Sequence, residues 1–374
     1  MINSPEFRSR VAGELASRAP KISTLSAFVG LDGFVDEILH VVDKRHDATR
    51  YDRVPTIAAF AQRLAAAAGQ SANLELVNVM TKLGGNGPIM GNALASFGLN
   101  VTYVGSLGWP ALHPVFESFA QRADVNSISE AGLTDALEFE DGKLMVGKHY
   151  MLKHISWENI IARYGREKFS HQVASASLVA FVNWTMLPFM SDIWAAIQKE
   201  VLPHVAGPRR RMFFDLADPE KRLPADIAQA LELIAKFQEK FDVILGLNEK
   251  EAHEIASVLG LDVATRDWQG LSELTAAIQR RVPVETVVVH PTSYALAVSG
   301  GEAAVVAGPA CRKPKITTGA GDHFNSGFCL GKLLGLDNAA SLLCGVTTSG
   351  YYVRTAESPS AEQVAQLMRA WPEQ

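Results

Sequence analysis

The sequence has few of the features that mark several large protein classes, and each shortage narrows its function. Three cysteines in 374 residues are too few for a disulfide framework, and their positions lack the spacing of metal ligands. No stretch approaches the ~18 consecutive apolar residues of a membrane-spanning helix. Charged residues are scattered through positions 1–20, unlike a signal peptide. We therefore expect a soluble protein of a reducing, cytoplasmic compartment.

An excess of basic residues is also missing. Lys and Arg number 35 against 40 Asp and Glu, which gives a formal net charge of -5. This balance argues against a nucleic-acid-binding surface. The glycine pattern of a Walker-type nucleotide loop does not occur, and Gly85-x-Gly87 is followed by Met90 where a dinucleotide-binding fingerprint has a third small residue. A small molecule is the expected partner, and a dehydrogenase is disfavoured.

The composition, 48% hydrophobic and 20% charged, is that of a chain with a sizeable core. Short apolar runs alternate with segments of helical spacing, which is typical of a mostly parallel sheet covered by helices on both faces. We find no linker or internal repeat, so one α/β domain is expected. The predicted strands are 25–31, 74–79, 101–104, 178–182, 212–214, 243–245 and 286–289, and the predicted helices are 56–68, 87–97, 188–201, 225–241 and 249–259.

Two segments, 37–53 and 133–150, interrupt this alternation. The first carries His, Asp and Arg between apolar residues, and the second contains Asp141-Gly142, a strong hairpin-turn signal. A β-ribbon inserted into an α/β domain is either a lid or dimer-forming flap, or a plain surface hairpin. Periodicity alone does not separate these interpretations.

The most informative stretch is a loop of small residues that leads into a helix, Ile316–Phe328. Its glycines allow the backbone to approach a ligand, and free N–H groups at a helix start bind anions. Asp322 lies in the first turn of that helix. It either stabilises the helix start or accepts a proton from a hydroxyl during phosphoryl transfer.

Several motifs together resemble the PfkB-type, ribokinase-like carbohydrate kinases. Gly319-Ala320-Gly321-Asp322, followed by Phe324, is similar to the C-terminal signature of that family. Gly84-Gly85-Asn86-Gly87 and the helix that ends at Phe97-Gly98 resemble the N-terminal signature, with Val101–Gly108 as the strand and turn that follow it. Asn248-Glu249-Lys250-Glu251 resembles the Asn-x-x-Glu element, and the resemblance extends over about residues 25–356.

The resemblance implies a three-layer α/β/α ribokinase-like domain over 25–374, preceded by an N-terminal extension over 1–24, with a small β-lid built near 37–53 and 133–150. It also implies ATP- and Mg²⁺-dependent phosphorylation of a hydroxyl on a sugar or sugar-like substrate. Two alternatives stay open: a nucleoside kinase of the same fold, and a non-catalytic ligand-binding protein on a kinase scaffold. A homodimer formed through the lid is a further expectation.

The resemblance also assigns roles. Asp322 is expected to be the base, and the amides of Gly319, Ala320 and Gly321 are expected to form the anion hole. Asn248 and Glu251 are expected to organise Mg²⁺ through water. The residues expected to bind substrate are Asp32 or Asp36 with Gly84, Gly85 and Asn86, and those expected near the nucleotide are Asn248, His290, Thr292, Gly345 and Thr348.

The sequence departs from the family pattern at three places. Ile89 occupies the position of a usual Asn, and neither Asn86 nor Asn92 is in register to replace it. His290 stands where the family has a Thr-x-Gly nucleotide contact; it either contacts the nucleotide or caps a turn. For the substrate-binding aspartate, Asp36 is favoured although it lies one residue late, and Asp32 is the alternative. After the strand 212–214, either Asp215 or Asp218 is expected to face the cleft unless it caps the next helix.

Overall fold

A computed structural model describes residues 1–265 and 267–372 of the chain. Its body is built around a nine-stranded sheet in the order β14-β13-β12-β11-β10-β9-β1-β5-β6. The seven strands from β12 to β6 are parallel, and β13 and β14 continue the sheet antiparallel. The strands are β1 (Ser26–Leu31), β5 (Asn100–Ser106), β6 (Asp124–Ser129), β9 (Leu178–Val182), β10 (Arg210–Asp215), β11 (Phe241–Leu247), β12 (Thr286–Val289), β13 (Tyr294–Ser299) and β14 (Glu302–Ala307).

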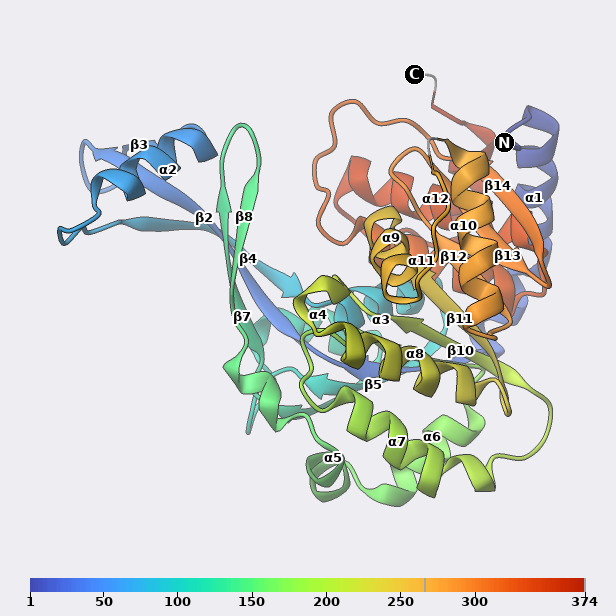
Figure 1. The fold of residues 1–374 in the computed structure, drawn as a ribbon. Helices are drawn as coiled ribbons and strands as arrows, with labels where there is room; N and C mark the ends of the chain where they lie inside the picture. Colours follow the sequence, from blue (N-terminus) through green and yellow to red (C-terminus); the bar gives the residue numbers. More distant parts are fainter. Residues whose placement is uncertain (266, 373–374) are drawn as a thin grey trace.

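Helices cover both faces of this sheet and form two separate cores (Figure 1). Strands β9 and β12 are buried along their whole length, as expected for strands covered on both faces. One core includes α5 (Trp157–Arg163), α6 (Arg166–Ser175), α7 (Met190–Glu200), α8 (Pro224–Phe237), α9 (Glu249–Val258) and α10 (Trp268–Arg281). The other includes α1 (Pro5–Arg18), α3 (Asn86–Ser96), α4 (Glu117–Ala120), α11 (Ala320–Leu333), α12 (Asn338–Thr355) and α13 (Ala361–Arg369). The predicted three-layer α/β/α architecture is confirmed.

A second, five-stranded sheet projects from the body and forms the lid (Figure 1). Its elements are β2 (Phe34–Arg45), β3 (Tyr51–Arg53), β4 (Leu76–Gly84), β7 (Gly132–Glu138), β8 (Lys143–Lys148) and the helix α2 (Ile57–Ala66) packed on it. The predicted ribbons 37–53 and 133–150 lie in this sheet. The predicted strand 74–79 and helix 56–68 also belong to the lid, whereas their place in the βα alternation had suggested the main sheet.

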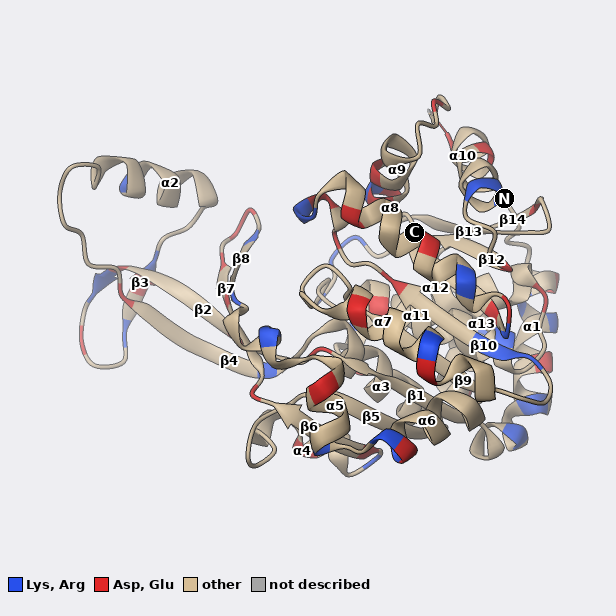
Figure 2. Cartoon of the chain, turned by 60° about the horizontal axis from the view of Figure 1, so that its bottom comes forward, with Lys and Arg blue, Asp and Glu red and all other residues tan. Residues whose placement is uncertain are grey.

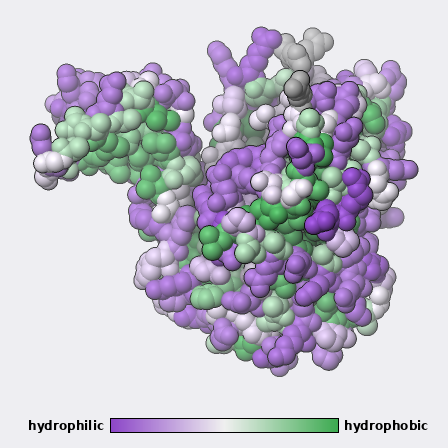
Figure 3. All heavy atoms as spheres, in the orientation of Figure 1, coloured by the Kyte–Doolittle hydropathy of each residue, from purple (hydrophilic) through white to green (hydrophobic). Residues whose placement is uncertain are grey.

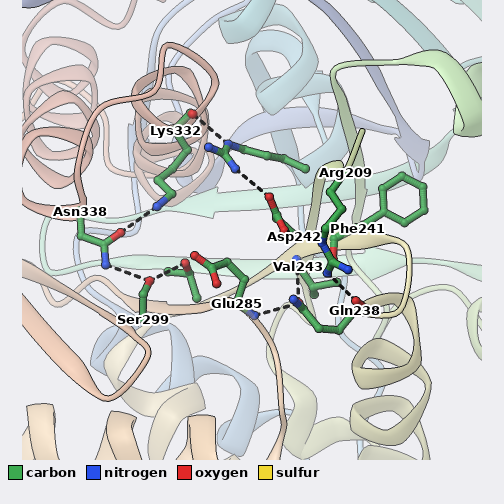
Figure 4. A network of polar contacts seen from close by, with 11 residues as sticks. Arg209, Gln238, Phe241, Asp242, Val243, Glu285, Ser299, Lys332 and Asn338 are labelled. Atoms are coloured by element: carbon green, nitrogen blue, oxygen red, sulfur yellow. Dashed lines mark hydrogen bonds and ion pairs between the residues drawn. The ribbon is translucent and has the colours of Figure 1, made fainter. Parts of the chain in front are cut away.

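Helix α11 begins after Gly319 and packs along α12. Its glycines allow α12 to pack closely, because a Cβ on Gly331 would lie 2.7 Å from Ser341 Cα. At the far end of α11, Lys332 Nζ donates to Asn338 Oδ1 at 2.9 Å, and Asn338 Nδ2 donates to Ser299 Oγ of β13 at 2.9 Å (Figure 4). This polar network fixes the C-terminal end of α11. The loop of residues 317–321, here called the glycine loop, leads into the N-terminus of the same helix.

The first 24 residues pack onto the body. Val11, Ala12 and Leu15 of α1 are fully buried, and Ile2 pairs with β14 through a bridge to Val306. Lys and Arg are interspersed with Asp and Glu along the body helices (Figure 2). Among the helices of the described residues, none combines the length and apolar character needed to cross a membrane. Residues 373–374, the end of the expected kinase domain, lie outside the described part.

Candidate active site

The glycine loop lies between two cavities at the carboxyl ends of the parallel strands. Gly319 precedes α11 with φ 94 and ψ 1, a left-handed conformation that favours glycine. Thr318, Gly319 and Asp322 line the smaller cavity, of about 270 Å³. Ala320 and Gly321 line the larger one, of about 800 Å³. The loop is therefore a wall shared by both cavities.

The smaller cavity, here called the acceptor cavity, is enclosed by the body on one side and the lid on the other. Phe34, Asp36, Thr134, Met145 and His149 come from the lid strands or the segment directly after β8. Its remaining lining residues are Gly85, Asn86, Ile89, Gly147, Asn183, Met186, Lys221, Thr318, Gly319 and Asp322. Carboxylate, amide and ammonium groups thus converge on a space open to a small polar molecule.

Asp322 is held in this cavity by Asn86. The Asn86 Nδ2 donates to Asp322 Oδ1 at 2.9 Å, and Asp322 is 7% exposed. Burial raises the pKa of Asp322 to about 7, against the opposing effect of the Asn86 hydrogen bond. A carboxylate with a pKa near neutrality and a fixed orientation is suited to accept a proton at physiological pH.

Asp32 and Asp36, the two candidate substrate aspartates, have different surroundings. Asp32 is fully buried at the end of β1, where its carboxylate accepts from Asn86 N at 3.0 Å, Gly87 N at 2.8 Å and Asn183 Nδ2 at 2.7 Å. Burial raises the pKa of Asp32 to about 6 despite these hydrogen bonds. Asp32 therefore caps the start of α3 and holds Asn183.

Asp36, by contrast, is part of the acceptor cavity wall. Its Oδ2 lies 3.8 Å from Lys82 Nζ on the neighbouring strand β4. Burial raises the pKa of Asp36, while the Lys82 ammonium partly offsets this effect. A Cβ at position 84 would clash with the Asp36 carboxylate, so Gly84 makes room for it. This placement accords with Asp36 as the favoured substrate ligand.

The larger cavity contains residues that the family resemblance predicts to be near the nucleotide, and it is here called the nucleotide cavity because of that expectation. His290 lies against Phe324 with ring centroids 4.8 Å apart, and a Cβ on Gly321 would lie 3.1 Å from His290 Cε1. Burial lowers the pKa of His290 to about 4, so its imidazole is neutral. Asn248, His290 and Thr292 line this cavity, together with Tyr294, Pro309, Thr317, Ser349 and Trp371.

Gly345 and Thr348 lie on the face of α12 that packs against α11. A Cβ on Gly345 would lie 2.7 Å from Phe324 Cε2, and Thr348 Oγ1 donates to Cys344 O at 2.8 Å. Their neighbours Val346 and Ser349 line the nucleotide cavity instead. The predicted segment of α12 is thus beside the nucleotide cavity, but the helix presents a different face to it.

Asn248 and Glu251 form a capping box at the start of α9. Glu251 accepts from Asn248 N at 2.8 Å and Asp218 N at 2.9 Å, while Asn248 Oδ1 accepts from Glu251 N at 2.9 Å. Burial, together with the nearby Asp215 carboxylate, raises the pKa of Glu251. The pKa of Asp215 is likewise raised by burial and by the charge of Asp322. Of Asp215, the last residue of β10, and Asp218, which follows the strand, only Asp215 is buried.

Sequence reasoning missed several polar side chains of the site, among them Asn183 and Lys82. Asn183 follows β9 directly, has φ 62, and donates to Asp32; a polar residue at the carboxyl end of a buried parallel strand is the signal that indicates such a position. Lys82 lies two residues before the glycine pair, on a strand whose place in the lid the sequence pattern did not reveal. No local motif indicates it.

Comparison with solved structures defines the class of the fold. Ribokinase of Arabidopsis thaliana, solved with ribose and ATP, superposes with a TM-score of 0.64 at 17% identity, covering 92% of this chain and 98% of that one. Adenosine kinase of Sinorhizobium meliloti gives 0.62 at 18% identity, with 92% and 98% covered. The chain therefore has the ribokinase fold.

Sequence comparison then gives the family. A family model described as prokaryotic ketohexokinase matches residues 17–371. A ketohexokinase of Haloferax volcanii is 30% identical over 337 residues, covering 90% of this chain and 88% of that protein. The chain belongs to the prokaryotic ketohexokinase family. It is a carbohydrate kinase that phosphorylates a hydroxyl of a sugar, as the resemblance to PfkB-type kinases predicted.

Proposed function

We propose that the protein transfers the terminal phosphoryl group of ATP to a hydroxyl of a ketohexose. The shared wall carries this proposal: Thr318 and Gly319 face the acceptor cavity, and Ala320 and Gly321 face the nucleotide cavity. In this proposal, a phosphoryl group bound at Gly321 in the nucleotide cavity is transferred past the loop to a hydroxyl held beside Asp322 in the acceptor cavity. The ketohexose assignment rests on the family model and on the Haloferax volcanii relative.

In this proposal Asp322 accepts the proton of the reacting hydroxyl, and Asn86 orients its carboxylate. Asp36 and Asn183 bind other substrate hydroxyls from two sides of the cavity. Of the three amides expected to form the anion hole, that of Ala320 is already engaged, because Ala320 N donates to Thr317 O at 3.1 Å. Within the described chain the N–H of Gly321 donates to no acceptor, which favours it for the phosphoryl oxygens.

Mg²⁺ is the metal that the family resemblance implies, and the buried acids fit it. The carboxylates of Asp215 and Glu251 are close enough that the charge of one raises the pKa of the other, so a cation between them would lower that repulsion. In the described residues, Asn325 Oδ1 is buried without a hydrogen-bond partner. We propose that these residues hold Mg²⁺ through water, where it would neutralise charge on the nucleotide phosphates.

The proposal is tested by steady-state phosphorylation of D-fructose, D-glucose and adenosine with ATP and Mg²⁺. D-fructose is expected to give the highest kcat/KM, with no turnover when Mg²⁺ is removed by a chelator. Preference for adenosine would establish the nucleoside kinase alternative. Binding of fructose without turnover of any substrate would establish a ligand-binding protein on the kinase scaffold.

We also propose a cytoplasmic homodimer joined through the lids. Strand β4 is an edge strand paired to β2, and Leu76, Val79 and Met80 on it are each at least 43% exposed. Apolar surface covers much of the lid in Figure 3. An exposed apolar edge strand favours pairing with a second copy. Light scattering of the wild type and of Met80→Lys is expected to give dimer and monomer; a monomeric wild type would overturn this proposal.

A further inference from the structure

His323, the residue after the proposed base, contacts the glycine loop with its side chain. Its Nδ1 lies 2.7 Å from Gly319 O, and its Nε2 lies 2.9 Å from Ser358 Oγ. A carbonyl oxygen only accepts, so Nδ1 carries the proton. Nε2 then accepts from the Ser358 hydroxyl. With Nδ1 donating and Nε2 accepting, both ring nitrogens are engaged in a single tautomer.

Tyr352 of α12 makes a second contact to the same loop. Its hydroxyl donates to Thr318 O at 2.9 Å. Its ring stacks on His323, with centroids 3.7 Å apart and an interplanar angle of 13°. The two side chains therefore form one unit that binds two successive carbonyl groups directly before α11.

Fixing these carbonyls also fixes the amides that follow them. A peptide unit is planar, and in the trans form its N–H points opposite to its C=O. Holding Thr318 O sets the direction of the Gly319 N–H, and holding Gly319 O sets that of the Ala320 N–H. The same turn leads directly into Gly321 and Asp322, so its conformation also sets where the base lies.

We infer that His323 and Tyr352 are positioning residues that keep the glycine loop in its phosphoryl-binding conformation before substrates arrive. Such preorganisation lowers the reorganisation required in the transition state, so its loss reduces turnover more than ground-state binding. Ser358 contributes by fixing the tautomer, and it is itself held by α3, because Ser96 Oγ donates to Ser358 O at 2.9 Å. This inference rests on the proposed function of the loop.

Tyr352→Phe is the most selective test, because it removes one hydroxyl and keeps the ring over His323. We expect kcat to fall roughly tenfold, equivalent to one buried hydrogen bond, with the KM for D-fructose changed less than about twofold. Tyr351→Phe is the matched control: the Tyr351 hydroxyl accepts from Gln363 Nε2 at 2.7 Å, away from the loop. Its turnover is expected to equal that of the wild type.

His323 is tested by a pair of variants. His323→Ala removes the donor to Gly319 O, and kcat is expected to fall by about 10 to 10². His323→Asn places an amide N–H near the position of Nδ1 and is expected to restore most of that loss. Equal kcat in the wild type, Tyr352→Phe and His323→Ala would overturn the inference, as would a rise in KM alone. If His323→Ala fails to fold, Tyr352→Phe decides.

Hydrogen exchange of the ligand-free protein separates this inference from the proposed function. Both His323→Ala and Tyr352→Phe are expected to accelerate exchange in a peptide covering residues 317–322, while Tyr351→Phe leaves it unchanged. This readout requires no substrate. If the wild type has no fructokinase activity but the variants still accelerate exchange in the loop, the proposed function is refuted and the positioning role of His323 and Tyr352 stands. If the wild type is active but exchange in the variants is unchanged, only the positioning role of His323 and Tyr352 is refuted.

Discussion

The glycine-loop end of the body and the lid face each other across the acceptor cavity, yet they are built differently. The loop lies between α3, α11 and α12, and Asp322 beside it is 7% exposed. The lid has only a small core of its own, formed by Leu39, Val41, Val54, Phe60, Leu137 and Phe139. Its strands leave Met80 and Met145 about half exposed, at 55% and 49%.

This difference suggests a division of labour. Groups that act on the reacting atoms need fixed geometry, which a packed body supplies. Groups that enclose substrate and exclude water need to open and close, and a thin sheet with few buried contacts moves at low cost. Substitutions in the body should therefore lower turnover, whereas substitutions in the lid should alter binding and exchange.

The largest effect is expected for Asp322→Asn. If Asp322 is the base, turnover falls by on the order of 10² to 10⁴ while the fold and substrate affinity survive. Asp337→Asn is the matched control, because Asp337 Oδ1 caps α12 by accepting from Ala340 N at 2.7 Å, and Asn caps helices equally well. Steady-state kinetics and melting curves of both variants provide the measurement. An Asp322→Asn enzyme with more than about a tenth of wild-type turnover would make Asp322 a helix cap.

The two aspartates near the acceptor cavity are expected to respond in opposite ways. If Asp36 binds a substrate hydroxyl as proposed, Asp36→Asn weakens a charged hydrogen bond, and the KM for D-fructose is expected to rise roughly 10- to 10²-fold with little change in stability. Asp32→Asn places an amide against the N–H groups of Asn86 and Gly87 and lowers stability by about 1–3 kcal/mol. Measuring KM and the denaturant midpoint of each variant separates the roles. The reverse pattern would make Asp32 the substrate ligand.

Much of the fold was predictable, because a buried parallel strand is a continuous apolar run. The predicted strands 178–182 and 286–289 coincide with β9 and β12. The run 74–79 was placed in the wrong sheet, because an apolar run does not encode its pairing partner. That partner, β2, is about 40 residues earlier in the chain and pairs antiparallel with β4 over Phe34–Val41, with a register shift between Ile38 and Leu39.

Local motifs predicted the parts of the site that are close in sequence, such as the loop 319–322 and Asn86. Asn183, Lys82 and Tyr352 reach the site from other elements, so no spacing along the chain indicates them. For α12 the predicted helix lies beside the nucleotide cavity, but the predicted residues are on another face of it. Gly345 faces Phe324, whereas Ser349 faces the nucleotide cavity. A rotation of the helix about its axis is fixed by packing against α11, which the sequence pattern did not resolve.

Activity and stability are expected to depend on pH with opposite signs. The pKa of Asp322 is about 7 because of burial, and only the deprotonated carboxylate accepts a proton. The kcat/KM should therefore rise about tenfold per pH unit below 7 and level off above it. A profile that is flat between pH 5.5 and 8 in the wild type would contradict a base with this pKa.

Stability should decrease over the same range. In the unfolded chain Asp322 and Asp32 titrate near 4, whereas their folded pKa values are about 7 and about 6. Between these values the folded state binds more protons, so the free energy of unfolding falls as pH rises from about 4 to 7. Melting of the ligand-free protein at pH 5.5 and 8 measures this, and Asp322→Asn should flatten part of the slope. A slope unchanged in that variant would show that other groups carry it.

The smallest effect, and the most direct test of the division, concerns movement of the lid. Residues 133–150 carry Thr134, Met145 and His149 into the acceptor cavity, so closure over substrate should bury their backbone and exclude water, which competes as a phosphoryl acceptor.

Hydrogen exchange in this segment should slow when D-fructose and a non-hydrolysable ATP analogue are added together. The helix α2 is the internal control, because it packs on the lid core through Phe60 and lines neither cavity. Protection that appears in 133–150 and is absent from α2 would show closure onto substrate. Equal exchange with and without ligands in both segments would show that the lid does not close over substrate. The lid and the body would then differ in how tightly they are packed but not in whether they move.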